Sequence, residues 1–174
     1  MRALNDLRVV ELGTEVSAPY CARLFADLGA DVIKVEAPGG DPSRALGPFA
    51  GNEPDPEESA IFHYLNAGKR GVVADLDDVA GRHFFHSLLE GADVLVENAE
   101  PGAHARWGLE AASLLARYPH LVSVSISPYG RSGPWADRPG TDLTAQAASS
   151  LPLALGMGDR EPLRIPFDQA DYQA

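Results

Sequence analysis

The first 36 residues place two short apolar runs around one amphipathic segment, and this arrangement restricts the fold more than any other feature. Leu7–Leu12 and Val32–Val35 are the apolar runs, the second rich in β-branched residues, and both are typical of buried strands. Between them, residues 17–28 carry apolar side chains at helical spacing, and Gly29 is placed to end that helix in a left-handed conformation. This order of elements, which is strand, loop, helix, turn and strand, predicts the first part of a parallel α/β sheet. The loop at residues 13–19 then lies at the carboxyl end of a strand, where open α/β sheets bind ligands.

The predicted helix at residues 17–28 has one apolar side. Leu24, Phe25 and Leu28 share this side, and Cys21 precedes Leu24 by three residues. We expect these side chains to face the sheet. Cys21 is the one cysteine of the chain, so it cannot form an internal disulfide, and its position favours a small buried hydrophobe over a reactive thiol.

The same alternation continues through the middle of the chain. Three further apolar runs predict strands at residues 72–76, 94–97 and 121–126. Helical spacing predicts helices at residues 59–65, 79–90 and 109–118, and a shorter helical piece that carries Arg106 and Trp107 after a loop at residues 98–102. The predicted fold class is therefore α/β, a Rossmann-like doubly wound parallel sheet.

The predicted helix at residues 79–90 carries both apolar and titratable side chains. Four apolar residues are available for the core: Phe84, Phe85, Leu88 and Leu89. His83 and His86 are neighbours on this helix, and we expect them on its solvated face.

The last third of the chain has less regular patterning. A Gly- and Pro-rich loop is predicted at residues 127–142, and the small apolar residues at 143–155 predict a buried helix or a packed extended piece. Residues 168–172 predict the start of a helix, which has nothing to pack against so close to the last residue. Length and a 45% hydrophobic, 22% charged composition indicate one globular domain. We therefore expect one domain that is part of a larger protein.

The net charge of −11 limits the kinds of partner. An acidic surface disfavours nonspecific binding to nucleic acid or to anionic membranes, so we expect neither as a partner. The sequence has no apolar run of membrane-spanning length and no signal-peptide pattern at its start. These features predict a cytoplasmic location.

Short motifs exclude several kinds of site and leave one. The spacing of one cysteine and five histidines offers no zinc pattern, and no metal ligands are predicted. The sequence also lacks a G-x-S-x-G elbow, a Walker loop and a G-x-G-x-x-G fingerprint. Four predicted loops share the carboxyl edge of the sheet: residues 13–19, 37–44, 77–78 and 98–106. There Asn98 and Arg106 could bind a ligand phosphate, or they could be a turn residue and a surface arginine.

Longer stretches of the sequence resemble a known family. LRVVELGTEVSAPYCARLFADLGADVIKVEAPGGDPSR, FHYLNAGKRGVVADL, ADVLVENAEPG and PFDQADYQA occur in the order and spacing of the family III CoA-transferases. This family includes formyl-CoA transferase, carnitine CoA-transferase and α-methylacyl-CoA racemase. The resemblance implies that residues 1–174 are the N-terminal, Rossmann-like, CoA-binding portion of the large domain, without its C-terminal part and the small domain. It also implies an interlocked homodimer for the full-length protein.

The resemblance further implies an acyl-CoA:carboxylate CoA-transferase with Asp171 as its nucleophile. From spacing alone, Asp171 is only one acidic residue near a helix start. In the family, the matching aspartate forms a covalent aspartyl-CoA intermediate, with acyl-CoA and a carboxylic acid as substrates and no tightly bound cofactor. In the family, the donors that stabilise the oxyanion come largely from a glycine-rich loop that follows the segment corresponding to residues 1–174. We therefore expect residues 1–174 alone to be inactive.

The residues that correspond to CoA contacts in the family match unevenly. The implied contacts are Glu15, Val16 and Ser17 near the thioester, Ala74 and Leu76 near the adenine, and Asn98, Ala99 and Arg106. Ala37 stands where the family usually has arginine, and Asp77 stands where a lysine is common. We expect these two departures to weaken the attraction for a polyphosphate, by about 1.5–3 kcal/mol for each lost charged hydrogen bond.

Two other functions stay open at this stage. Racemases of the family place a histidine before the aspartate of the G-x-D segment, which here reads Gly140-Thr141-Asp142. Thr141 cannot shuttle a proton at neutral pH, which favours CoA transfer over racemisation. The departures at Ala37 and Asp77 leave a non-catalytic CoA-binding half of a fused protein as the other alternative.

Overall fold

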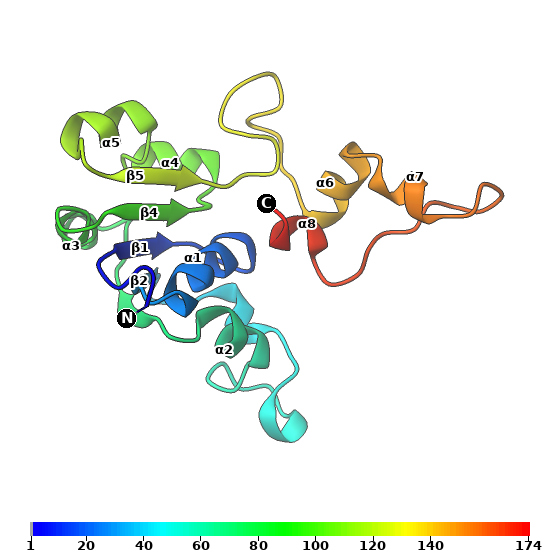
Figure 1. The fold of residues 1–174 in the computed structure, drawn as a ribbon, viewed down its shortest axis with the longest axis horizontal. Helices are drawn as coiled ribbons and strands as arrows, with labels where there is room; N and C mark the ends of the chain where they lie inside the picture. The colour runs from blue at the N-terminus through cyan, green and yellow to red at the C-terminus, as the bar shows by residue number, and fades with distance from the viewer. Residues whose placement is uncertain (1) are drawn as a thin grey trace. The chain divides into compact units, whose positions relative to one another are not determined.

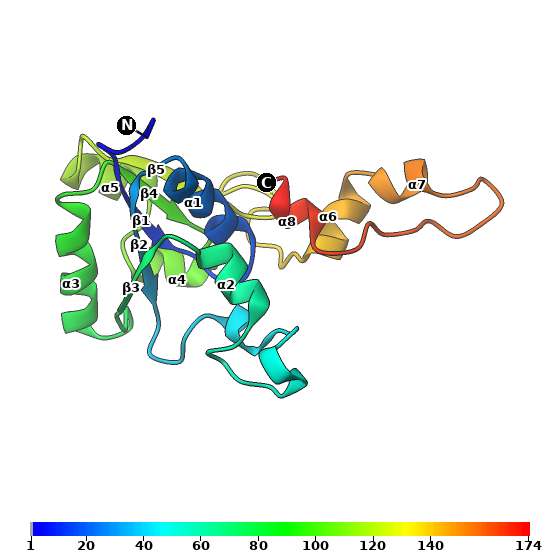
Figure 2. The ribbon, with the colours of Figure 1, turned by 60° about the horizontal axis from the view of Figure 1, so that its bottom comes forward.

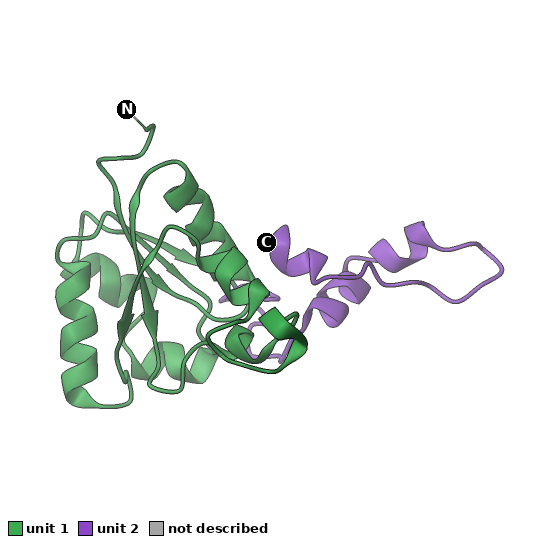
Figure 3. Cartoon of the chain, turned by 90° about the horizontal axis from the view of Figure 1, so that it is seen from below, with its two compact units in different colours: residues 1–126 green, residues 127–174 purple. Residues whose placement is uncertain are grey.

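The computed structural model describes residues 2–174, which divide into two compact units. The first unit extends to residue 126 and the second comprises residues 127–174 (Figure 3). The sheet and its covering helices belong to the first unit.

The first unit is built on a five-stranded sheet in which every pairing is parallel (Figure 1). The strands are β1 (Arg8–Leu12), β2 (Asp31–Glu36), β3 (Arg70–Val73), β4 (Val94–Glu97) and β5 (Val122–Ser125). Their order in the sheet is β3-β2-β1-β4-β5, so the chain reverses its direction of winding between β1 and β4. This confirms the predicted fold class and makes the carboxyl end of β1 the topological switch point. Strand β3 begins and ends earlier than predicted, so Ala74 and Leu76 follow the strand instead of lying in it.

Helices cover both faces of this sheet, which is the doubly wound arrangement (Figure 2). One face carries α1 (Ser17–Asp27), with α2 (Ala60–Asn66) packed beside it. The other face carries α3 (Val79–Leu89) and α5 (Ala111–Arg117). The short helix α4 (Pro101–Arg106) follows β4, and two 3-10 turns, η1 (Pro42–Ala45) and η2 (Ala50–Asn52), lie in the long loop after β2.

Helix α1 meets the sheet through small residues and not through the leucines that the helical spacing indicated. Ala18, Ala22 and Ala26 are buried against Val9 and Val32 of the sheet. Leu24 and Leu28, by contrast, are 47% and 52% exposed, so their prediction as core residues was wrong. Alanines let the helix lie close to the β-branched surface of the strands, and this close approach turns the larger side chains outward.

Two other side chains of α1 are intermediate in their exposure. Phe25 and Cys21 are partly buried and pack at the border of the alanine cluster. Burial raises the pKa of the Cys21 thiol above its ordinary value, with the nearby carboxylate of Glu11 adding to the shift. The thiol is therefore protonated at neutral pH, as expected for a packing residue.

Helix α3 buries two of the predicted core residues and one histidine. Phe85 and Leu89 are fully buried, whereas Phe84 is 42% exposed. His86 is buried, so its predicted place on a solvated face was wrong. Its Nδ1 lies 3.1 Å from the hydroxyl of Tyr118, and that hydroxyl donates to the His86 carbonyl oxygen. Tyr118, which directly follows α5, thus gives the buried imidazole of His86 a hydrogen-bond partner.

The second unit contains α6 (Asp142–Ala148), α7 (Leu151–Leu155) and α8 (Gln169–Tyr172). The apolar stretch predicted as one element is thus two helices, separated where Ser150 adopts a left-handed conformation with φ of 60°. Helix α8 confirms the helix start predicted near the last residue. Among residues 2–174, no helix combines the length and the apolar character that crossing a membrane requires.

Candidate functional site

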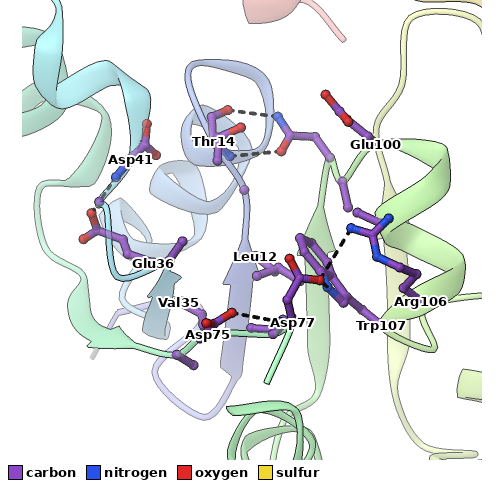
Figure 4. A pocket seen from close by; sticks show the side chains of 18 residues that line it. Leu12, Thr14, Val35, Glu36, Asp41, Asp75, Asp77, Glu100, Arg106 and Trp107 are labelled. Carbon is purple, nitrogen blue, oxygen red and sulfur yellow. Dashed lines mark hydrogen bonds and ion pairs between the residues drawn. The ribbon is translucent and has the colours of Figure 1, made fainter. Parts of the chain in front are cut away.

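A cavity of about 360 Å³ opens at the carboxyl ends of the first four strands (Figure 4). All four loops predicted to meet at this edge contribute to its lining, so their predicted juxtaposition is confirmed. Its apolar lining includes Leu12, Val35, Ala74, Leu76, Ala99, Ala103 and Trp107. A mostly apolar hollow with a few polar groups is the usual form of a small-molecule site.

The charged residues around this cavity are mostly acidic. Its acidic lining consists of Glu36, Asp41, Asp75, Asp77 and Glu100, and among the described residues Arg106 is the only basic one in the lining. Two of the acids have cationic partners from outside the cavity. Glu36 binds Arg44 through two contacts of 2.8 and 3.0 Å, and Asp41 binds Lys34 at 2.7 Å. The remaining charge of the cavity therefore depends largely on Asp75, Asp77 and Glu100 against Arg106.

Asp77 and Arg106 contact each other across the mouth of the cavity. The carboxylate of Asp77 accepts a 3.0 Å hydrogen bond from Trp107 Nε1 and lies 3.5 Å from Arg106 Nη2 (Figure 4). The indole hydrogen bond, together with Arg106, lowers the pKa of Asp77 below its ordinary value. Asp77 is thus an anion that partly neutralises the one lining cation. A bound phosphate would have to compete with this carboxylate for Arg106.

Asn98, at the end of β4, holds the loop that follows β1. Its Oδ1 accepts from Thr14 N at 3.0 Å, while its Nδ2 donates to Thr14 O at 2.9 Å and to Ser17 Oγ at 3.1 Å. Both amide protons of Asn98 are therefore committed to this loop. The structure places Asn98 at the cavity as predicted, but shows a positioning role for its side chain.

The predicted thioester contacts lie in different environments within this loop. Glu15 is exposed and has a φ of 61°, whereas Val16 and Ser17 are buried at the start of α1. The residues of this loop that line the cavity are Gly13 and Thr14. The contacts of Glu15, Val16 and Ser17 with a ligand stay a prediction.

Buried charged residues beside the cavity were not predicted as site residues. Lys34 of β2 is the register partner of Glu11 in β1, and the two side chains form a buried ion pair of 2.8 Å. A sequence signal existed, because each charge interrupts an otherwise apolar strand, in RVVEL and in DVIKVE. Only the register of the parallel pairing shows that the two charges meet.

Asp171 lies on α8, in the second unit, where it is partly buried. The helix is tied to α6 by Asp142, whose Oδ1 accepts from Ala170 N at 2.8 Å. Gln146 of α6 also binds the preceding segment through both the N–H and the carbonyl of Ile165. The backbone beside Asp171 is thus fixed by two buried polar side chains. Among the described residues, no three His, Cys, Asp or Glu side chains gather as a metal site.

The fold and the site first define a class, a Rossmann-like α/β protein with a ligand cavity at the switch point of its sheet. The sequence matches the profile of CoA-transferase family III over residues 4–174, so the chain belongs to this family and the resemblance is confirmed.

Individual relatives agree with this assignment. The chain is 45% identical over 166 residues to succinyl-CoA:(R)-benzylsuccinate CoA-transferase subunit BbsE of Thauera aromatica, covering 95% of this chain and 40% of that protein. It is 39% identical over 171 residues to succinate–glutarate CoA-transferase of Agrobacterium fabrum, covering 97% of this chain and 43% of that protein.

A solved structure extends the comparison to the fold. The crystal structure of a CAIB/BAIF family protein from Brucella suis matches with a TM-score of 0.88 and 39% identity, over 98% of this chain and 45% of that one. The chain thus spans about two fifths of the length of the curated relatives it matches.

Proposed function

We propose that the protein containing this chain transfers CoA from an acyl-CoA to a free carboxylic acid, with Asp171 as the nucleophile. The observation that carries this proposal is the family match over residues 4–174, which includes the segment around Asp171. Relatives at 39–45% identity are named as CoA-transferases that act on succinyl-CoA or succinate. The proposed substrates are accordingly an acyl-CoA and a carboxylic acid, and no tightly bound cofactor is needed.

The proposed reaction proceeds through carboxylate exchange at Asp171. One carboxylate oxygen attacks the thioester carbon, the C–S bond breaks, and a mixed anhydride and CoA thiolate form. The thiolate then attacks the aspartyl carbonyl carbon, which releases the donor acid and leaves an aspartyl-CoA thioester. The acceptor carboxylate displaces the thiolate by attack on this thioester. Attack of the thiolate on the acceptor acyl carbon then forms the new acyl-CoA and restores the carboxylate of Asp171.

The cavity of the first unit is the proposed site for the nucleotide end of CoA. Its apolar lining at Ala74, Leu76 and Ala99 suits an adenine, and Arg106 offers a fork of donors to a phosphate. Glu15, Val16 and Ser17 are proposed to border the thioester. An interlocked homodimer and a cytoplasmic location complete the proposal, supported by the family resemblance.

Trapping of the intermediate tests this function. The whole protein, mixed with acyl-CoA and hydroxylamine, should acquire a hydroxamate at Asp171 that is detected by peptide mass spectrometry. Asp171→Asn should abolish both the hydroxamate and the transfer, whereas Asp168→Asn, a matched acid at the start of the same helix, should preserve them. Transfer that survives in Asp171→Asn would show that another residue is the nucleophile.

A non-catalytic CoA-binding protein is the second candidate, and the acidic cavity favours it. Ala37 supplies no cation, and Asp77 engages Arg106. Calorimetry of the whole protein with CoA discriminates, because binding without turnover of any acyl-CoA would support this candidate. Racemisation has less support, since Thr141 caps α6 through its side chain and its hydroxyl is not a base at neutral pH.

A further inference from the structure

Four charged side chains lie buried beneath the loop that follows β1. They are Glu11, Lys34, Asp41 and Lys69, and each of these side chains is at most 2% exposed. The set contains two cations and two anions, so its charges balance. The proposed chemistry uses none of the four, and only Asp41 lines the cavity.

Lys34 is the centre of this charged cluster. Its Nζ donates to Glu11 Oε1 at 2.8 Å, to Asp41 Oδ2 at 2.7 Å and to the carbonyl oxygen of Gly13 at 2.9 Å. An ammonium group has three protons, so each is used. Burial opposes the charged form, but the carboxylates of Glu11 and Asp41 outweigh it and raise the pKa of Lys34. The ammonium therefore holds the backbone at Gly13 throughout the neutral range.

Asp41 connects Lys34 to Glu15 in the loop that follows β1. Its second oxygen, Oδ1, accepts from Glu15 N at 3.1 Å and from both the backbone N–H and the hydroxyl of Ser43. One carboxylate thus joins Lys34 on one side to the backbone of Glu15 on the other. Burial disfavours its charge, yet Lys34 and Ser43 hold the pKa of Asp41 below its ordinary value.

Lys69 fixes Glu11 and the start of α1. Its Nζ donates to Glu11 Oε2 at 2.6 Å and to the carbonyl oxygen of Pro19 at 2.8 Å. A third contact, of 2.8 Å, reaches Asn66 Oδ1 at the end of α2. Burial lowers the pKa of Lys69 to about 8, so the ammonium is the main form at neutral pH.

The segment that these contacts hold has an unusual backbone. Glu15 adopts a φ of 61°, which residues with a side chain rarely do. Gly13 is bound by Lys34, Thr14 by Asn98 and Glu15 by Asp41, so three side chains from separate parts of the chain fix three successive residues. A conformation of this kind persists only where the surroundings determine it.

Stability alone is a poor explanation for such a cluster. Apolar residues of similar volume often replace buried ion pairs without loss of stability, because desolvation offsets the charge attraction. Apolar side chains could not bind the Gly13 carbonyl and the Glu15 N–H, however. The role that an apolar replacement could not fill is therefore holding the backbone at Gly13 and Glu15.

We propose that Lys34 and Asp41 are positioning residues that order the backbone of residues 13–15 before the CoA thioester binds. This inference rests on the proposed function, which places the thioester beside this loop. A loop ordered in advance loses less conformational entropy on binding, and this gain appears as affinity for the ligand.

Asp41→Asn in the whole protein tests this role. The substitution keeps an oxygen for Glu15 N, but it turns an amide donor toward the ammonium of Lys34. We expect the Glu15 N–H, without ligand, to exchange with deuterium about tenfold faster, and the Kd for CoA to rise about tenfold, as for one lost charged hydrogen bond. Asp31→Asn is the matched control, because Asp31 pairs with Arg70 at the opposite end of β2. It should change neither readout.

A milder variant covers the case in which Asp41→Asn does not fold. Ser43→Ala removes one hydrogen bond of 2.7 Å to Asp41 and leaves the ion pair with Lys34 intact. It should shift both readouts in the same direction by a smaller factor. A folded variant with unchanged exchange at Glu15 would overturn the inference, whether or not CoA affinity falls. Faster exchange with unchanged CoA affinity would also overturn it.

The proposed function can fail separately. A wild-type protein that binds no CoA would overturn the proposed function and the ligand named here. Exchange at Glu15, measured without any ligand, would still decide whether Asp41 orders the loop. Conversely, a hydroxamate at Asp171 together with normal CoA affinity in Asp41→Asn would support the function and overturn the positioning role.

Discussion

Gln146 joins α6 to the segment that leads into α8, and replacing it with methionine tests how firmly the helix that carries Asp171 is held. The Gln146 side chain is buried, with the residue only 1% exposed. Its Nε2 donates to Asp142 Oδ2 at 2.7 Å and to Ile165 O at 3.0 Å, and its Oε1 accepts from Ile165 N at 2.8 Å. Methionine has a similar volume and makes none of these hydrogen bonds.

The expected loss follows from the groups left without a partner. An unsatisfied buried polar group costs about 1–3 kcal/mol, and a charged one lies at the upper end of this range. Ile165 is only partly buried, so its N–H and carbonyl belong at the lower end, while the carboxylate of Asp142 belongs higher. Burial of the more apolar methionine side chain offsets about 1 kcal/mol of this loss. Gln146→Met should therefore destabilise the contact between α6 and the segment at Ile165 by about 3 kcal/mol.

Hydrogen exchange of the whole protein measures this effect. A loss of about 3 kcal/mol predicts that the Ile165 N–H exchanges ~100-fold faster, with a parallel change at Ala170. The rate of hydroxamate formation at Asp171 should fall as well, because α8 is then less firmly placed. Gln173→Met is the control, since Gln173 is exposed and should shift stability by less than about 0.5 kcal/mol. Unchanged exchange at Ile165 in folded Gln146→Met would refute the reasoning.

Two further predictions concern titratable groups. Asp77→Asn should lower the Kd for CoA severalfold, most strongly at low salt, because the substitution removes the carboxylate that competes with a phosphate for Arg106. Calorimetry at two ionic strengths measures this Kd, and an unchanged or higher value would contradict the prediction. Burial, aided by Arg117, lowers the pKa of His86 below its ordinary 6.5, so the unfolded chain binds the proton more readily. The stability due to neutral His86 should therefore be present above pH 6.5 and be lost as pH falls below it. His86→Gln should flatten this slope in denaturant titrations, and an unchanged slope in the folded variant would contradict the prediction.

Much of the fold could be predicted because its signals are local. The strands at β1, β2 and β4 are short β-branched runs, and Gly29, with a φ of 105°, ends the helical region of α1 as its position indicated. The meeting of four loops at one edge also followed from the sequence, since parallel strands that are joined by helices must share their carboxyl edge.

The face of a helix that is buried depended on the residues packed against that helix in the folded protein. In α1, the spacing of Leu24 and Leu28 is helical, but the sheet accepts the alanine side, so both leucines are exposed. In α3, His86 is buried because Tyr118, distant in sequence, provides a hydrogen-bond partner for it. Periodicity identifies an amphipathic helix, whereas the shape and polarity of the packed neighbour select the face.

By itself, the sequence determined the order of the elements, the fold class and the family, because these are contained in local patterning and in long stretches of matching residues. The tertiary structure alone decided how the ligand loop is held. Glu11 meets Lys34 through the register of two strands, and Asn98 reaches Thr14 across 84 positions of the chain. Such contacts require residues far apart in sequence to be brought within hydrogen-bond distance, and packing of the whole sheet supplies that proximity.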